Sequence, residues 1–210
     1  CALPIFDNKT WHVPTLIRMR TMDLGDDSAY RNDPNLRYVA PMMRESWERL
    51  GKQFSERVSP EQRETLKALF DTELRIASLF RKAGVPMLAG SDAGGQWVIS
   101  GFSLHQEFDL LAEAGFSPLA ILQMTTRDPA RFLHRESTMG SVAVGKNADL
   151  VLLNDNPVTA VRNLHGVYAV VRAGASYGSD DLAALQEHTA SRQTQTEIGR
   201  AHGLTPVTFL

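Results

Sequence analysis

The chain has 210 residues, which is enough for one domain with a sizeable core, and its 43% hydrophobic and 22% charged residues are typical of a folded globular protein. The formal net charge of -2 and the lack of a basic stripe exclude nucleic acid as an expected partner. No apolar run is long enough to span a bilayer, and the single cysteine, Cys1, leaves no internal disulfide. We therefore expect no membrane partner and favour a cytoplasmic location.

The first third of the chain alternates between apolar and polar segments. Residues 11–19, "WHVPTLIRM", alternate weakly and predict a strand, in which Pro14 indicates an end or an irregularity. Residues 21–35 are rich in Gly, Asp and Asn and predict a loop. Residues 36–54 carry an apolar stripe at helical spacing and predict a helix.

A well-marked helix and a buried strand follow. Ser59 suits the N-cap, Pro60 suits the first helical position, and Gln62 completes a capping box. Gly84 suits the position just beyond the end of this helix. The apolar run Val85–Ala89 then predicts a strand buried on both faces, so that helix and strand form half of a βαβ unit.

The second half of the chain changes character near Gly140. Residues 103–115 predict a helix, another helix starts at Ser117, and residues 128–134 predict a short one. Residues 140–178 are β-rich and punctuated by Gly and Asn, which predicts a small antiparallel module. Residues 179–210 are polar and predict a peripheral helix followed by an extended end.

The motifs in the middle of the chain resemble a known family. In order they are "AGSDAGG", "LHQEFDLLAEAGFSPLAILQMTTRDPARFL", "GSVAVGKNADLVLLNDNP" and "YAVVRAGASY". Together these motifs are similar to the C-terminal part of metal-dependent amidohydrolases, especially the imidazolonepropionase-like and Xaa-Pro dipeptidase-like branch. The segment "WHVPTL" resembles the seventh barrel strand of that branch.

The resemblance implies an α/β fold. The family has a (β/α)₈ TIM barrel joined to a small β-sandwich, so residues 1–139 would supply the last barrel strands and helices. Residues 140–178 would supply part of the sandwich, and residues 179–210 a peripheral tail. Asp92 would then lie at the C-terminal end of the eighth strand, where barrel enzymes carry their chemistry.

The resemblance also implies a site. Asp92 would ligate a divalent metal, expected to be zinc, and accept a proton from water during hydrolysis of an amide or cyclic amide bond. His105, Gly94 and Gly95 would contact a small-molecule substrate. From the residues alone, Asp92 could equally be a turn residue, and His105 could hydrogen-bond to the Asp92 loop.

The chain departs from the family in its metal ligands. No His-x-His sequence occurs, and the six histidines do not map to the other ligand positions. Because the chain begins with Cys1 and not with Met, we expect a processed product or a piece of a longer protein. We therefore expect the remaining ligands to come from a missing N-terminal segment or a second chain, and the chain to form homo-oligomers that cover open strand edges.

Two alternatives from other functional classes stay open. "GASYG" matches the G-x-S-x-G pattern and would make Ser176 an esterase nucleophile, although Gly174 there turns a predicted hairpin. Ser103 in "GFSLH" is a near match and a candidate N-cap. The chain could also be a non-catalytic assembly fragment. We expect His12 to be packed in the barrel, and His165 and His188 to be solvated.

Overall fold

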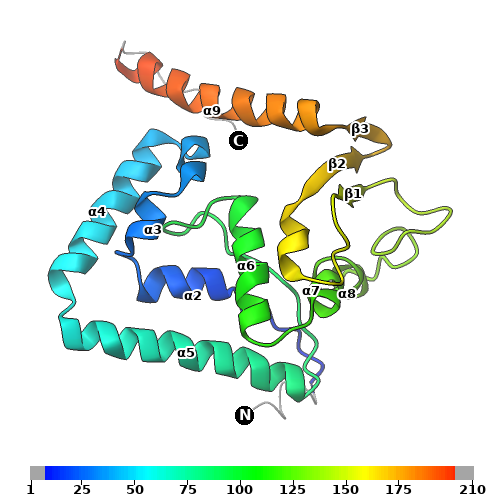
Figure 1. Cartoon of the computed structure of the whole chain (residues 1–210), viewed down its shortest axis with the longest axis horizontal. Coiled ribbons are helices and arrows are strands. Elements are labelled where there is room, and N and C mark those ends of the chain that lie inside the picture. The colour runs from blue at the N-terminus through cyan, green and yellow to red at the C-terminus, as the bar shows by residue number, and fades with distance from the viewer. Residues whose placement is uncertain (1–7, 202–210) are drawn as a thin grey trace.

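A computed structural model describes residues 8–201, with side chains for residues 8–193, so Cys1 lies outside the described part. The chain is mixed, with helices around a small antiparallel sheet (Figure 1). The elements in chain order are α2 (Leu16–Asp23), α3 (Ser28–Arg31), 3₁₀ helix η1 (Pro34–Tyr38), α4 (Pro41–Arg57), α5 (Pro60–Lys82), α6 (Phe102–Glu113), α7 (Pro118–Thr125), α8 (Arg127–Phe132), β1 (Leu150–Leu153), 3₁₀ helix η2 (Val161–His165), β2 (Val167–Arg172), β3 (Ala175–Tyr177) and α9 (Ser179–Ala201).

The start and end of α5 confirm the sequence prediction. The Ser59 side chain accepts a hydrogen bond from the backbone of Gln62, and the Gln62 side chain accepts one from the backbone N–H of Ser59, so the capping box is complete. Gly84 follows the helix in the left-handed region, with φ of 74°. Local sequence alone therefore determined both ends of the longest helix before α9.

The strand predicted over residues 11–19 is wrong beyond its first residues. His12 alone pairs with the segment that follows α5, and α2 begins at Leu16. Pro14 cannot donate to a strand ladder, and Thr15 turns the chain with φ of 47°. The predicted loop over 21–35 also contains helical turns, because Asp27 and Asp33 cap α3 and η1.

The segment Val85–Ala89 is extended and runs parallel to the segment around His12. The His12 N–H donates to the carbonyl of Pro86 at 3.0 Å, and the Leu88 N–H donates to the carbonyl of His12 at 2.9 Å. Val85 and Met87, which share one face, are buried, but Leu88 on the other face is only partly buried, so the predicted burial on both faces is not found. The pairing is a single parallel bridge at Met87, shorter than the predicted strand.

Pro41 divides the helix predicted over residues 36–54. Ala40 takes an extended conformation (φ -57°, ψ 136°), as expected of a residue before proline, and α4 starts at Pro41. Ser117 caps α7 as predicted by accepting from the Ala120 N–H at 3.2 Å. Ser103, however, is not the N-cap of α6, because Gly101 occupies that position and Ser103 lies inside the helix.

The antiparallel module was predicted to begin at residue 140, but its first strand, β1, begins at Leu150. Its sheet has the order β1-β2-β3, with both pairs antiparallel. Ala173 and Gly174 turn the β2–β3 hairpin with φ of 51° and 82°, which confirms the predicted turn at Gly174. Val142 and Val144 belong to irregular chain before β1 and are exposed, so the prediction of strands there is wrong.

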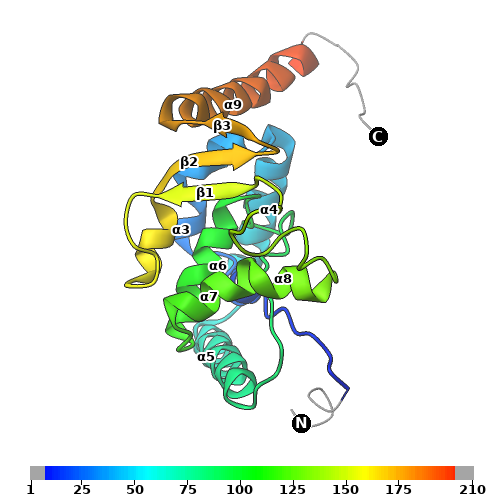
Figure 2. The same ribbon diagram turned by 90° about the vertical axis from the view of Figure 1, so that its right-hand side faces the viewer.

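Two apolar clusters hold the described residues together. The larger one gathers α2, α5, α6, α7 and the Val85–Met87 segment, with Leu111 and Ile121 fully buried. The smaller one consists of Tyr30, Val39, Trp47, Trp97 and Ile99. Figures 1 and 2 show α9 at the opposite end of the molecule from α5, with α6 and the sheet between them.

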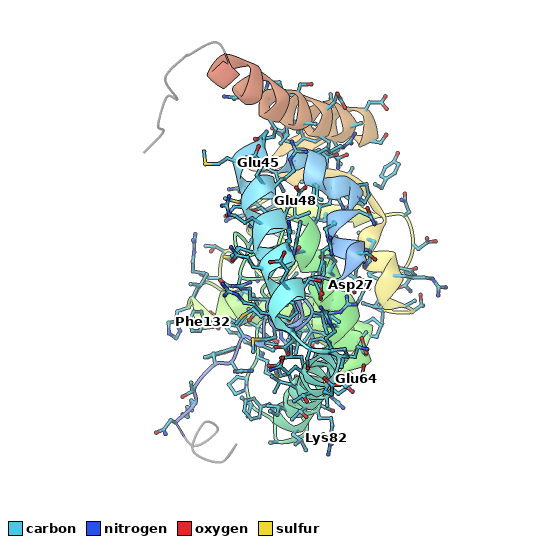
Figure 3. The ribbon with its side chains drawn as sticks, turned by 90° about the vertical axis from the view of Figure 1, so that its left-hand side faces the viewer. Asp27, Glu45, Glu48, Glu64, Lys82 and Phe132 are labelled. Carbon is cyan, nitrogen blue, oxygen red and sulfur yellow. The ribbon has the colours of Figure 1, made fainter. Side chains whose placement is uncertain are left out.

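The exposed surface of α4 and α5 is mixed, with acidic side chains beside apolar ones such as Met42 and Leu79. Glu45, Glu48 and Glu64 are exposed there, as Figure 3 shows. None of the helices in the described part of the chain is long and apolar enough to cross a membrane. The tail predicted after residue 179 is helical as α9, and its predicted extended end lies outside the described residues.

Candidate functional site

Asp92 lies just beyond the C-terminal end of the parallel segment Val85–Ala89. Its backbone adopts the left-handed region, with φ of 51°, which Asp tolerates better than most residues. Its side chain is 68% exposed, and Oδ2 lies 3.8 Å from Nε of Arg18. The carboxylate therefore faces open space, with the Arg18 guanidinium as a neighbouring positive charge.

Two glycines shape the loop around this carboxylate. Gly94 has φ of 104°, a conformation that L side chains rarely adopt, and its added Cβ would meet open space. A Cβ on Gly95 would come within 2.6 Å of Arg18 Nε, so this glycine makes room for the guanidinium. The Arg18 side chain thus lies against Gly95, and the substrate contact expected at Gly94 and Gly95 stays a prediction.

Aromatic packing anchors the far side of the loop. The Trp97 indole N–H donates to the carbonyl of Gly25 at 2.8 Å, and the Gln96 amide donates to the carbonyl of Trp47 at 3.2 Å. Trp97 is buried against Tyr30 and Trp47. The loop that carries Asp92 is thus tied to the smaller apolar cluster.

Glu107 is a buried carboxyl near the candidate site that the sequence analysis missed. It is fully buried, and its Oε2 accepts from the Ile17 N–H at 2.7 Å. Helix α2 has no side-chain cap of its own at Thr15, so a carboxylate 90 residues away along the chain fills that role. The sequence contained one signal of this buried carboxyl, because Glu107 lies on the apolar face of the helix predicted over residues 103–115.

The electrostatics of Glu107 follow from its burial. Burial raises the pKa of Glu107 to about 7, while hydrogen bonds from the backbone of Ile17 and Leu16 act in the opposite direction. Its second oxygen, Oε1, is buried without a hydrogen-bond partner. Because α2 also carries Arg18, this buried carboxyl fixes the helix that brings a guanidinium to Asp92.

His105 lies two residues before Glu107 and therefore faces roughly the opposite side of α6. Its ring contacts His165, with ring centroids 5.2 Å apart, and Phe108 at 5.4 Å. Burial lowers the pKa of His105, and the neighbouring His165 lowers it further, while Asp109 opposes both. Its Nδ1 is buried and has no hydrogen-bond partner.

The other histidines divide into packed and exposed ones. His12 is packed, but its ring lies edge-on against Phe80 of α5, and burial lowers its pKa. His165 is not simply solvated as predicted, because its Nε2 lies 3.0 Å from Asp109 Oδ1. His188 is exposed on α9, in agreement with the prediction.

Neither candidate serine has the setting of a nucleophile. Ser103 is fully buried, where its Oγ accepts from the Ile99 N–H at 2.8 Å and lies 3.0 Å from Gln106 Oε1. Ser176 is exposed in β3 opposite Val171, after a hairpin turn. A G-x-S-x-G nucleophile needs a turn from a strand into a helix, which this hairpin does not provide.

The described residues do not fit a metal ion by themselves. Among residues 8–193, no group of three or more His, Cys, Asp and Glu side chains could hold one. Asp92 is a single exposed carboxylate beside an arginine. A catalytic zinc takes about three protein ligands, so the zinc site that the resemblance implies is not complete within this part of the chain.

Comparison with known proteins identifies the family. Residues 34–177 match the Amidohydrolase family. Bottromycin amidohydrolase superposes with a TM-score of 0.72 at 26% identity, over 87% of this chain and 40% of that one. A Xaa-Pro dipeptidase with bound methionine shares the fold, with a TM-score of 0.57 at 22% identity, over 83% of this chain and 36% of the dipeptidase.

A sequence relative covers a shorter stretch. Adenine deaminase 2 of Jannaschia sp. (strain CCS1) is 37% identical over 68 residues, which is 32% of this chain and 11% of the deaminase. The chain therefore spans less than half the length of these relatives. Because the family match extends over more than half of its residues, the chain belongs to the amidohydrolase family.

Proposed function

We propose that this chain is the C-terminal part of an amidohydrolase-family hydrolase that cleaves a carbon–nitrogen bond in a small amide or cyclic amide. On this proposal, residues 1–139 supply the last strands and helices of a (β/α)₈ barrel, and residues 140–178 supply part of a small β-sandwich. The observation that carries the proposal is the position of Asp92. It follows the C-terminal end of a segment that pairs in parallel with the segment around His12.

The chemistry assigned to Asp92 follows from its exposure. A carboxylate at the barrel mouth accepts the proton of a water molecule as that water attacks the substrate carbonyl. Arg18, at 3.8 Å, orients the carboxylate, and the anchored loop from Gly94 to Trp97 holds both in place. An exposed side chain with 68% of its surface free can reach a substrate, whereas the buried Glu107 cannot.

The proposal includes no step through a metal, because residues 8–193 contain no group of side chains that could hold one by themselves. We propose that a complete site needs ligands from polypeptide outside these residues. That polypeptide would be an N-terminal segment, a separate chain or a second copy of this chain. The exposed Val142 and Val144, and the free edge of the short strand β1, support contact with further polypeptide.

The test uses the protein isolated from its native source through a tag on this chain, together with whatever polypeptide accompanies it. Hydrolysis of a Met-Pro dipeptide and of a cyclic amide is measured for the wild type and for Asp92→Asn. Asp155→Asn is the matched control, because Asp155 is exposed in the loop after β1. We expect Asp92→Asn to be slower by about 100-fold, as for the loss of a general base, and the control to be unchanged.

Two outcomes would overturn the proposal. One is full activity in Asp92→Asn, and the other is no cleavage of either amide by the wild type. Ester cleavage that resists a chelator and disappears in Ser176→Ala or Ser103→Ala would instead support serine-type chemistry.

A further inference from the structure

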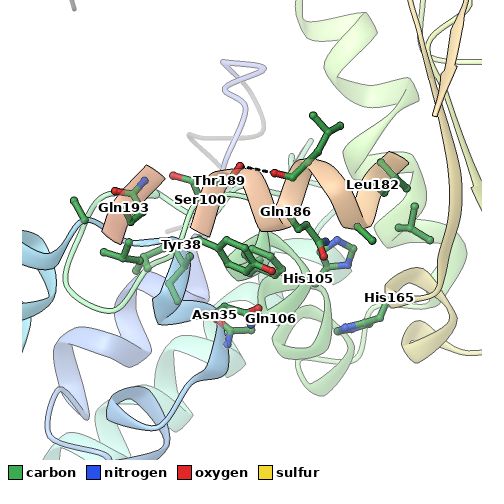
Figure 4. A pocket seen from close by; sticks show the side chains of 18 of the residues that line it. Asn35, Tyr38, Ser100, His105, Gln106, His165, Leu182, Gln186, Thr189 and Gln193 are labelled. Atoms are coloured by element: carbon green, nitrogen blue, oxygen red, sulfur yellow. Dashed lines mark hydrogen bonds between the residues drawn. The ribbon is translucent and has the colours of Figure 1, made fainter. Parts of the chain in front are cut away.

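A groove of about 1020 Å³ runs beneath α9 (Figure 4). Its roof is the face of α9 that carries Leu182 and Gln186, and its floor comes from η1, the start of α4 and the start of α6. Gly94, two residues after Asp92, also borders it. Sites that bind small molecules have volumes of roughly 300–1,000 Å³, so this groove is large enough for one.

An ion pair and an aromatic stack connect the elements that surround the groove. Arg37 Nη1 of η1 lies 3.9 Å from Glu187 Oε2 of α9, so an ion pair connects the two sides at the rim. Tyr38 and Phe102 stack with ring centroids 4.9 Å apart and planes 11° apart. The aromatic wall therefore joins η1 to α6.

One end of the groove carries two imidazoles. His105 and His165 enter from α6 and η2, and their ring centroids lie 5.2 Å apart. Asp109 lies behind His165 and sets its orientation through the 3.0 Å contact with Nε2. Gln186 adds an amide group that can both donate and accept hydrogen bonds. The amide of Gln106 also borders the groove, where its Oε1 lies 3.0 Å from Ser103 Oγ and its Nε2 donates to Asp33 Oδ2 at 3.4 Å.

Among the described residues, the side chains that line the groove include no acidic residue, lysine or arginine. The remaining lining combines apolar side chains, with Val39, Met43 and Trp47 on the floor and Leu182 in the roof, and uncharged polar ones. These polar residues are Asn35, Ser100, Ser179, Thr189 and Gln193. A ligand with a carboxylate would give up hydration there without gaining a fixed counter-charge, whereas a neutral amide would find both donors and acceptors.

We propose that this groove binds an uncharged small molecule that combines an aromatic group with an amide. The aromatic group packs against the wall formed by Tyr38 and Phe102, and against Trp47 on the floor. The amide hydrogen-bonds among the glutamine side chains and the imidazoles of His105 and His165. This binding does not depend on turnover at Asp92, so it is tested separately from the proposed function.

The probes are N-acetylphenylalaninamide and N-acetylphenylalanine, which differ by an amide in place of a carboxylate. Their binding to the full chain is measured by titration calorimetry at about pH 8, where an imidazole with a lowered pKa is neutral. We expect the amide to bind more tightly than the acid by about tenfold, which corresponds to about 1.4 kcal/mol. Undetectable binding of the amide, or equal binding of the two probes, would overturn the proposal.

Adjacent alanines on α9 provide a matched pair of variants. Both are exposed, but Ala183 borders the groove and Ala184 does not. We expect Ala183→Phe to fill the groove and weaken binding of the amide by about tenfold, and Ala184→Phe to bind like the wild type. Circular dichroism shows whether each variant is folded. Unchanged affinity in a folded Ala183→Phe, or an equal loss in Ala184→Phe, would place the probe elsewhere and reject the groove.

Discussion

The Asp92 loop and the middle of α6 each present a carboxyl group, and the two groups have opposite surroundings. Asp92 is 68% exposed and faces the Arg18 guanidinium at 3.8 Å. Glu107 is fully buried and accepts from the backbone of α2. The exposed carboxylate is the one to which we assign chemistry, whereas the buried one accepts a hydrogen bond from the first turn of a helix.

Helix α2 connects the two regions. Glu107 accepts the Ile17 N–H in the first turn of α2, and Arg18 follows immediately in the same turn. The guanidinium of Arg18 then reaches Asp92 past Gly95. A buried group thus positions an exposed one, and the predictions below separate the two contributions.

The largest expected effect is on stability. Glu107→Ala removes the acceptor for the N-terminal amides of α2 and leaves a void, so we expect the free energy of unfolding to fall by about 3 kcal/mol. Glu113→Ala, an exposed position on the same helix, should change it by less than about 0.5 kcal/mol. Urea denaturation of the variants measures both values. Equal losses would show that Glu107 has no special role.

The pH dependence of stability should follow from the same group. The pKa of Glu107 is about 7 in the folded chain and 4.5 as its ordinary value, so the folded state binds more protons between these pH values. Stability is therefore fully present below pH 4.5 and is lost as pH rises through 7, by up to about 3 kcal/mol.

Glu107→Gln should flatten much of this pH profile, as measured by urea denaturation across the window. Glu73, whose pKa burial raises to about 7, contributes with the same sign, so Glu73→Gln serves as the comparison. A profile that Glu107→Gln leaves unchanged would contradict the assignment.

A smaller effect is expected at the anchor of the Asp92 loop. Trp97→Phe removes the indole N–H that donates to Gly25, and a lost buried hydrogen bond costs about 1–2 kcal/mol. The thermal unfolding midpoint measures the cost. Trp11→Phe, a half-buried tryptophan outside both apolar clusters, is the control. A larger loss in the control would show that the anchor does not matter.

The smallest effect on stability is expected at Arg18 itself. A partly exposed ion pair with a separation of 3.8 Å contributes little, so Arg18→Gln should change the free energy of unfolding by less than about 0.5 kcal/mol. Its effect should appear instead in hydrolysis, measured with the native assembly. A large loss of stability would mean that Arg18 belongs to the fold, as Glu107 does.

Local signals predicted the parts of the fold that depend on neighbours in the chain. The Ser59 capping box, the Ser117 cap and the Gly174 hairpin turn all formed as expected, because each involves residues a few positions apart. The strand over 11–19 failed because the helix that replaces its second half is capped by Glu107, far along the chain. No local pattern contains that contact.

For the candidate site, too, the sequence predicted local features but not the contacts between distant residues. The motif around Asp92 located an exposed carboxylate at the end of a parallel segment. It could not show that Arg18 lies beside Gly95, or that His165 meets His105 and, across 56 residues, Asp109. Those contacts arise from tertiary packing, which brings η2 and α2 against α6.

The most direct measurement is amide hydrolysis by Asp92→Asn at a temperature where the variant is shown to be folded. Our account predicts a rate lower by about 100-fold, with the free energy of unfolding within about 0.5 kcal/mol of the wild type. A folded Asp92→Asn that hydrolyses the amide at the wild-type rate would contradict it.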